Sequence, residues 1–524
     1  MSRRPNLFLA LVASAVGLAT AAATTSVACA QTNTGSYDAL DPYRDAVQML
    51  KSGISSTADG SQHAALVSLR QLRDPSLVPL FERLIRSDDW SVRVDSVLGL
   101  AELSPNGKVD IERIASLPGE TDRDTAITAV LALKLADAEQ VRSMLDWSDL
   151  PSTSRVLLAG ELRRLGQSPD AALLNRLAKS KTPEVAGLAT AILIDMKAKD
   201  ADVLAQTCVA QVAALPPASR GNAVAQIAEA CSSDKLAGAG AFVASLLKLP
   251  EIPADSRMRA IGSLLVVSPV DAYAPLAEAV AADRSQVALV RYAVVLLASG
   301  ARAPAEQWAQ FRNGDAMLEA IADAGAAIAK GDNTLAFNQL VALERRVVLR
   351  AALDGARRLG PDAEKAFGVA CLNFILKPGN VPDQLRESLM LAIFRLAEVA
   401  PNELKAALAS NTVEESFKDQ ILLALLSSGT TEATAVARTA QGKTNRGGEG
   451  KIAVLVARNS DKVTPDELRT LWQVAGGATN LPAPIRTQAA WLWLKHSNKI
   501  NEAIAELAPA SAAGAKTTAG DAAP

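Results

Sequence analysis

Apolar residues recur along most of the chain at the three-to-four-residue spacing of a helix, in blocks that polar turns separate. The clearest pair of blocks runs from Arg73 to Leu103. Its first block begins at Asp74-Pro75, a combination typical of a helix start, and Ser87-Asp88-Asp89 forms a turn before the second. The pattern predicts two amphipathic helices. The second of them carries its apolar stripe on Val94, Val97, Leu98 and Ala101.

This helix pair recurs at intervals of roughly 30–37 residues, although residues 301–332 and 430–463 match it poorly. One hairpin cannot bury both of its apolar stripes, so each pair needs neighbours that cover it. The sequence therefore predicts an all-α fold, a right-handed α-solenoid of about thirteen helix-hairpin repeats over residues 38–507. Second helices are expected to start near Arg123, Arg155, Pro183, Arg220, Arg257, Gln286, Arg350, Arg386 and Arg486.

The repeated unit resembles a known family. It is similar to HEAT repeats, especially the short variety of phycobilisome-lyase-type proteins. Three features carry the likeness: a first helix that starts with proline, an aspartate in the turn, and Val-Arg at the start of the second helix. Asp89 with Val92-Arg93 is the best match; Asp122-Arg123 and Ser154-Arg155 match in part, and Glu184-Val185 lacks the arginine. The resemblance covers most of residues 60–300 and implies a HEAT- or armadillo-like superhelix. Such a fold does not specify a function.

The first thirty residues predict an export signal. Arg3 and Arg4 precede an apolar run over residues 7–19, and small residues at 28–30 are typical of a cleavage site. The apolar run is shorter than the ~20 residues that a membrane span needs, and no later run is long enough, so no transmembrane segment is expected. The mature protein is expected to be periplasmic or extracellular.

Two alternatives to ordinary secretion follow from the same segment. Cys29 could be lipidated, although Ser26 stands where a lipidation motif has an aliphatic residue, and twin-arginine export would need an apolar residue in place of Asn6. Residues 31–37 form a polar lead-in. The Ala/Gly/Thr-rich tail over 508–524 cannot offset its ordering entropy and is expected to be disordered.

Composition narrows the class of partner. The chain has 54 basic and 56 acidic residues, a net charge of −2, which becomes −4 when Arg3 and Arg4 are removed. A nucleic-acid-binding protein needs a basic footprint, and this balance supplies none. Aromatic residues make up only 4% of the chain, so the interior is built from Ala, Leu and Val, which suit close helix packing.

The sequence contains little that indicates catalysis. His63 and His496 are its only histidines, and no zinc, haem or nucleophile-elbow motif occurs, so no metal and no cofactor is expected. His496 shares an apolar stripe and is expected to be partly buried. Gly442-Lys443-Thr444 resembles the end of a phosphate-binding loop, but Ala437 stands where that loop needs glycine. Residues 441–451 are interpreted as a flexible insertion.

Three cysteines remain after cleavage of the signal: Cys208, Cys231 and Cys371. With a turn centred on Pro217, Cys208 and Cys231 are offset by about 7.5 Å along their hairpin, at 1.5 Å per residue. The helices also stand roughly 8–10 Å apart, beyond the reach of a disulfide. We therefore expect free thiols, with Cys231 partly exposed at a helix end.

The remaining candidates are arginines and tryptophans. Arginines at the starts of second helices could line a groove that binds carboxylates or phosphates, or could form an Asp–Arg ladder from turn to turn; Asp88, Asp89 and Asp122 favour the ladder. Trp491 is interpreted either as packed beneath the last helix or as an exposed binding residue. These candidates are Arg93, Arg123, Arg155, Arg220 and Arg257, with Trp90, Trp147 and Trp491 as exposed aromatics.

Architecture and missing chemistry together favour a secreted or periplasmic, non-catalytic scaffold that presents a superhelical surface to a protein or peptide. Two alternatives remain open. One is a lyase-related HEAT-like enzyme or enzyme subunit that acts on a small molecule, which would need a deep pocket with converging polar groups. The other is a structural protein of the cell envelope.

Overall fold

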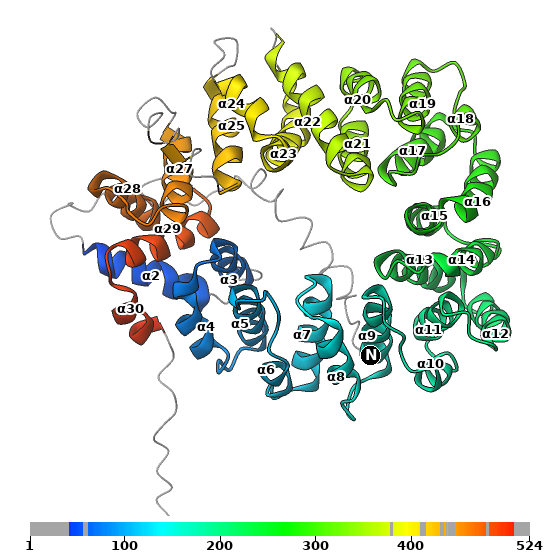
Figure 1. The fold of residues 1–524 in the computed structure, drawn as a ribbon, viewed down its shortest axis with the longest axis horizontal. Coiled ribbons are helices and arrows are strands. Elements are labelled where there is room, and N and C mark those ends of the chain that lie inside the picture. Colours follow the sequence, from blue (N-terminus) through cyan, green and yellow to red (C-terminus); the bar gives the residue numbers. More distant parts are fainter. Residues whose placement is uncertain are drawn as a thin grey trace, which may run out of the picture. The chain divides into compact units, whose positions relative to one another are not determined.

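The computed structural model describes residues 41–55, 61–377, 381–408, 415–429, 434–435, 438, 446–477 and 481–507. Within these residues the protein has 28 α-helices and no strand, and successive helices pack neighbour to neighbour (Figure 1). The prediction of an all-α solenoid is thus confirmed. None of the described helices is long and apolar enough to cross a membrane. The predicted export signal, Cys29 and the predicted disordered tail lie outside the described residues.

The helices belong to two compact units, which we call central and terminal. Of the described residues, the central unit holds those within Ala136–Gly429, and the terminal unit combines those within Thr24–Leu135 with those within Thr430–Pro524. The helices of the central unit are α8 (Ala138–Leu145), α9 (Ser152–Arg164), α10 (Ala171–Leu177), α11 (Pro183–Asp195), α12 (Ala201–Ala213), α13 (Pro217–Ser233), α14 (Gly240–Leu247), α15 (Ala254–Val267), α16 (Pro269–Ala282), α17 (Gln286–Ala298), α18 (Ala305–Ala309), α19 (Ala316–Ala329), α20 (Asn333–Ala342), α21 (Arg346–Leu359), α22 (Pro361–Leu376), α23 (Asp383–Val399), α24 (Pro401–Leu408) and α25 (Glu415–Ser427). Those of the terminal unit are α2 (Pro42–Ile54), α3 (Ser61–Leu72), α4 (Val78–Leu84), α5 (Trp90–Leu103), α6 (Ile111–Ala115), α7 (Glu120–Ala132), α27 (Arg446–Arg458), α28 (Pro465–Gly476), α29 (Ala483–His496) and α30 (Ile500–Leu507).

The helix pair that the sequence predicts most clearly is α4 with α5. A short 3₁₀ turn, η2 (Pro75–Leu77), precedes α4, and the Asp74 side chain accepts the backbone N–H of Ser76 there. Asp89 caps α5 in the same way. The predicted stripe of α5 is buried, with Leu98 only 4% exposed. Because two caps and one stripe agree, the local sequence specifies this hairpin well.

Four charged side-chain pairs link neighbouring helices. Their members lie 29 to 32 residues apart along the chain: Arg93–Asp122, Arg259–Glu229, Arg395–Glu364 and Arg163–Asp195. Such pairs fix the register of one helix on the next, since a charge-assisted hydrogen bond tolerates little displacement.

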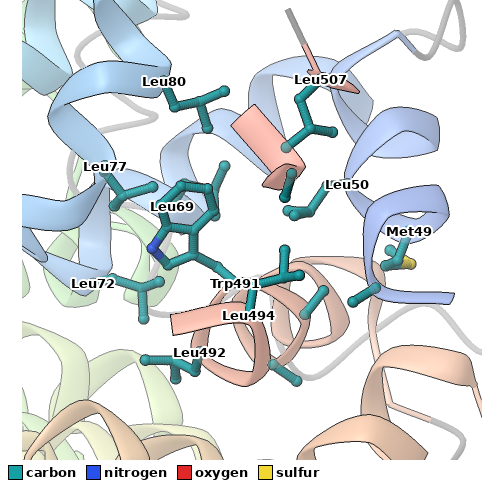
Figure 2. Close-up of a cluster of buried hydrophobic side chains, with 14 of the residues drawn as sticks. Met49, Leu50, Leu69, Leu72, Leu77, Leu80, Trp491, Leu492, Leu494 and Leu507 are labelled. Atoms are coloured by element: carbon teal, nitrogen blue, oxygen red, sulfur yellow. The ribbon is translucent and has the colours of Figure 1, made fainter. Parts of the chain in front are cut away.

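The first and last described helices share one hydrophobic core in the terminal unit. Helices α2, α3 and α4 pack against α28, α29 and α30 (Figure 1). Trp491 is fully buried there, and Figure 2 shows its indole among Leu69, Leu72 and Leu77. Its Nε1–H donates to the Ser76 hydroxyl at 3.1 Å. The solenoid therefore covers the apolar face of its first repeat with its last repeats.

Polar contacts support the same packing. Lys495 Nζ lies 2.8 Å from Asp74 Oδ2, and Tyr43 donates its hydroxyl to Glu506 Oε1 at 2.6 Å. Gln488 also donates to the backbone carbonyl of Ser68 at 2.8 Å. Because these contacts lie around the shared core, they specify how the two ends of the chain meet.

The flexible insertion predicted for residues 441–451 is wrong over its second half. Helix α27 begins at Arg446 and runs through Gly450, while residues 441–445 lie outside the described part of the chain. A Cβ atom at Gly450 would stand 2.6 Å from Leu481 Cδ1 and 2.9 Å from Val474 Cγ2. The glycine therefore serves close helix packing there, and packing outweighs its low helix propensity.

Candidate functional site

The five candidate arginines share one structural position. Each is the fourth residue of its helix: Arg93 in α5, Arg123 in α7, Arg155 in α9, Arg220 in α13 and Arg257 in α15. A helical side chain leans toward the N-terminus of its helix, so a residue one turn from the start reaches back over the turn that precedes the helix. The carbonyls at the end of the preceding helix lack intrahelical partners and attract positive charge.

Arg155 and Arg220 bind backbone carbonyls at the end of the preceding helix or in the turn that follows it. Arg155 donates from Nε to the Leu150 carbonyl at 3.0 Å and from Nη2 to the Trp147 carbonyl at 2.8 Å. Arg220 donates from Nη2 to the carbonyls of Ala213 and Leu215, both at 2.9 Å. Each arginine therefore links the start of its own helix to the preceding turn, within one hairpin. For these two the ladder interpretation is wrong, because backbone carbonyls rather than aspartates are the main acceptors within reach.

Arg93 forms the contact that the ladder interpretation predicts. Its Nε donates to Asp122 Oδ2 at 3.0 Å, and its Nη2 contacts the same oxygen. Its Nη1 also donates to the carbonyls of Ser87 and Asp88, at 2.7 and 2.8 Å. Arg93 thus links its own turn to the next repeat. Arg123, one residue after Asp122, is half-buried.

Arg257 occupies the same position but has no hydrogen-bond partner among the described residues, and its Nε is buried. The carbonyl of Pro250, in the turn before its helix, accepts instead from Arg220 Nη1 at 2.5 Å. The guanidinium of Arg257 is consequently left without an acceptor.

Among the described residues, hollows open beside three of these arginines. One of about 760 Å³ lies between α4, α5 and α6 and is lined by Arg93, with Arg86 and Arg113. A second, of about 270 Å³, lies between α9 and α10 and is lined by Arg155 and Arg176. A third, of about 220 Å³, is lined by residues of α15, α16 and α17. It includes Arg257, Arg291 and Tyr292.

The hollows of α4–α6 and α9–α10 each contain an arginine whose guanidinium binds no other described residue. Arg86 is exposed at the end of α4, and Arg176 is exposed on α10. The α9–α10 hollow has no acidic residue in its lining, and its other residues are serines and leucines. In the α4–α6 hollow, Glu82 and Asp88 partly balance the arginines. Both hollows present unpaired guanidinium donors beside a small apolar surface.

The three candidate tryptophans have different environments. Trp90, the first residue of α5, is 45% exposed, as expected for a surface aromatic. Trp147 is half-buried, and its carbonyl is held by Arg155. The interpretation of Trp491 as exposed is wrong, because the leucines of α3 and α4 cover it. The sequence could not predict this contact, because these leucines lie far from Trp491 along the chain.

A polar cluster on α3 and α5 was missed in the sequence. His63 Nδ1 lies 2.8 Å from Asp95 Oδ2, and Arg70 donates to Asp95 Oδ1 at 2.9 Å and to Glu102 Oε1 at 2.8 Å. The hydrogen bond with Asp95 raises the pKa of His63, because it stabilises the charged ring. The separation of 32 residues between His63 and Asp95, one repeat length, is the signal that could have found the pair.

The other titratable candidates lie in the interior. All three described cysteines are free, which confirms the predicted thiols, but Cys231 is fully buried rather than partly exposed because the hairpins around α13 cover it. Burial raises the pKa of Cys208 to about 11. His496 is half-buried as predicted, lies 2.9 Å from the carbonyl of Ala457, and has its pKa lowered by burial. No group of metal-ligating side chains occurs among the described residues.

The fold and these hollows define an α-solenoid with arginines at the turns of its repeats. No protein-family model matches the chain, and no curated protein matches it.

Proposed function

We propose that this protein is an exported, non-catalytic scaffold in which each of the arginine-lined hollows of the helix turns binds an acidic segment of a protein or peptide. The observation that carries this proposal is the unpaired arginine in each of two hollows, Arg86 and Arg176. The resemblance of the repeats to HEAT repeats supports it. The export signal predicted over residues 1–30 supports a periplasmic or extracellular location.

The chemistry of the hollows favours carboxylates. A guanidinium forms charge-assisted, often bidentate hydrogen bonds with a carboxylate, and an arginine without an internal acceptor has all of its donors available. Leu173 and Leu177 line the α9–α10 hollow beside Arg176, so the aliphatic part of a glutamate side chain has apolar surface to cover. An extended segment with spaced glutamates fits this combination of charge and shape.

Fluorescence anisotropy with labelled peptides tests the proposal. The probe is a twelve-residue peptide of alternating Glu and Gly, and its control has Gln in place of Glu. Wild-type protein is expected to bind only the Glu peptide, with an affinity that falls as salt is added. Each hollow is expected to bind the peptide on its own, so the double variant Arg86→Gln/Arg176→Gln, which weakens one charge contact in each hollow, is expected to lose about tenfold in affinity.

A matched control removes the same charge elsewhere. Arg284 and Arg469 are exposed and line none of the three hollows. The double variant Arg284→Gln/Arg469→Gln is expected to bind as the wild type does. Equal binding of both peptides, or equal losses in the two double variants, would contradict the proposal. A small-molecule activity in the same preparations would favour the enzyme alternative, and concentration-dependent self-association the structural one.

A further inference from the structure

The hollow between α15, α16 and α17 differs from the other two in its lining. It is mostly apolar, with Ile252, Met258 and Ala279 among the residues that line it. Its volume is about 220 Å³. An apolar cavity of about 150 Å³ is enough to hold a benzene molecule, so a ring-sized apolar group fits here with room for a polar substituent.

Two polar groups in this pocket have no partner in the protein. Arg257 forms no hydrogen bond with any described residue, and its Nε is buried. Tyr292 is 7% exposed, and no hydrogen bond joins its hydroxyl to another described residue. Burial raises the pKa of Tyr292, so the hydroxyl stays protonated and remains a donor. The pocket thus presents a guanidinium and a phenol that are both able to donate and that form no hydrogen bond with another described residue.

Two carboxylates also line the pocket, and neither forms a hydrogen bond or an ion pair with Arg257. Asp283 Oδ1 accepts the backbone N–H of Ser285 at 2.9 Å, and Asp255 lies 3.5 Å from Arg291 Nη1. A partly buried guanidinium that forms no hydrogen bond is costly, and a ligand that supplies a carboxylate acceptor recovers part of that cost.

We propose that this pocket, around Arg257 and Tyr292, binds a carboxylate carried on an apolar group of about the size of a benzene ring. The carboxylate accepts from Arg257 and Tyr292, and the apolar group packs against Ile252, Met258 and Ala279. Two sources have this chemistry: a free aromatic or branched aliphatic acid, and the C-terminal residue of a peptide that ends in an apolar side chain. This site is separate from the arginine hollows of α4–α6 and α9–α10, so either proposal can fail without the other.

The test compares acids with their neutral amides by ligand-detected NMR on the mature chain. Benzoate and benzamide probe the free acid, and Ala-Ala-Phe with a free or an amidated C-terminus probes the peptide source. At least one acid is expected to bind about tenfold more tightly than its amide, because the amide cannot accept a charge-assisted pair of hydrogen bonds. If only the peptide acid shows this preference, the ligand is a chain terminus.

Variants locate the site. Arg257→Gln is expected to abolish the preference for acid over amide, and it should fold normally because the guanidinium has no hydrogen bond to lose. Ala282→Leu, at an exposed position of the lining, is expected to block both acid and amide by filling the pocket. Arg284→Gln removes an adjacent charge that does not line the pocket and is expected to change nothing.

Three results would overturn the proposal. One is that neither acid binds more tightly than its amide. Another is that Arg257→Gln keeps the tenfold preference, and the third is that Ala282→Leu binds both probes as the wild type does.

Discussion

Replacing Trp491 with alanine removes a fully buried indole from the core that the first and last helices share (Figure 2). A tryptophan buries roughly 200 Å² of surface, which at about 25 cal/mol per Å² corresponds to about 5 kcal/mol. Measured costs of large-to-small substitutions in cores agree, at about 3–5 kcal/mol for Trp→Ala. We therefore expect the terminal unit to lose about 4 kcal/mol of stability, which lowers its melting temperature by about 10 °C.

The position of the damage is more informative than its size. Helices α3 and α4 lie more than 400 residues before Trp491 in the chain, as the separation of 415 between Ser76 and Trp491 shows. Hydrogen–deuterium exchange of Trp491→Ala should therefore speed up in residues 61–84 as well as in α29. Trp493, half-buried on the same helix, provides the control, and Trp493→Ala should have a much smaller effect on residues 61–84. Unchanged exchange in residues 61–84 of Trp491→Ala would refute the shared core.

Four further predictions can be checked separately. Leu98→Asp should destabilise the terminal unit by several kcal/mol in thermal unfolding followed by circular dichroism, because it buries an unpaired charge. His63→Gln should lower the free energy of unfolding more at pH 5.5 than at pH 8. The pKa of His63 is raised in the folded protein, so protonated His63 stabilises the fold fully below about 6.5, the pKa in the unfolded chain. This contribution disappears as the pH rises through the folded pKa. A loss in chemical denaturation that is equal at both pH values would argue against the pair with Asp95. Non-reducing peptide mapping of the exported protein should find no disulfide between Cys208 and Cys231. N-terminal sequencing of the mature chain should begin at Gln31, and a start at Met1 would exclude cleavage.

Local features of this fold could be predicted from the sequence because local residues determine them. The caps at Asp74 and Asp89 and the stripe around Leu98 each depend on contacts within one hairpin, and the structure has all three. The meeting of the chain's ends could not be predicted, because both repeats that cover each other have ordinary amphipathic helices. Nothing in the pattern around Trp491 distinguishes a partner in α30 from one in α3.

The positions of the candidate arginines could be predicted from the sequence, but the groups that they bind could not. The sequence places an arginine early in these second helices, but their acceptors differ. Arg220 binds carbonyls of its own turn, and Arg93 binds an aspartate of the next repeat as well as carbonyls of its turn. Arg257 binds neither kind of acceptor. Which acceptor each arginine finds depends on the turn that precedes it and on its neighbours. Arg86 lies in the turn after α4 and Arg176 lies on α10, both away from the repeated motif, and only the hollows identify them.

Zero-length carbodiimide cross-linking of the mature protein tests most directly whether the first and last helices pack together. Lys51 Nζ, on α2, lies 3.6 Å from Glu506 Oε2, on α30, and both side chains are about half exposed. The pair Lys365–Glu403, at 3.3 Å and similar exposure, provides an internal standard from the central unit. We predict that mass spectrometry of the monomer finds both cross-linked peptides. Recovery of the Lys365–Glu403 link without any link between α2 and α30 would contradict the shared core.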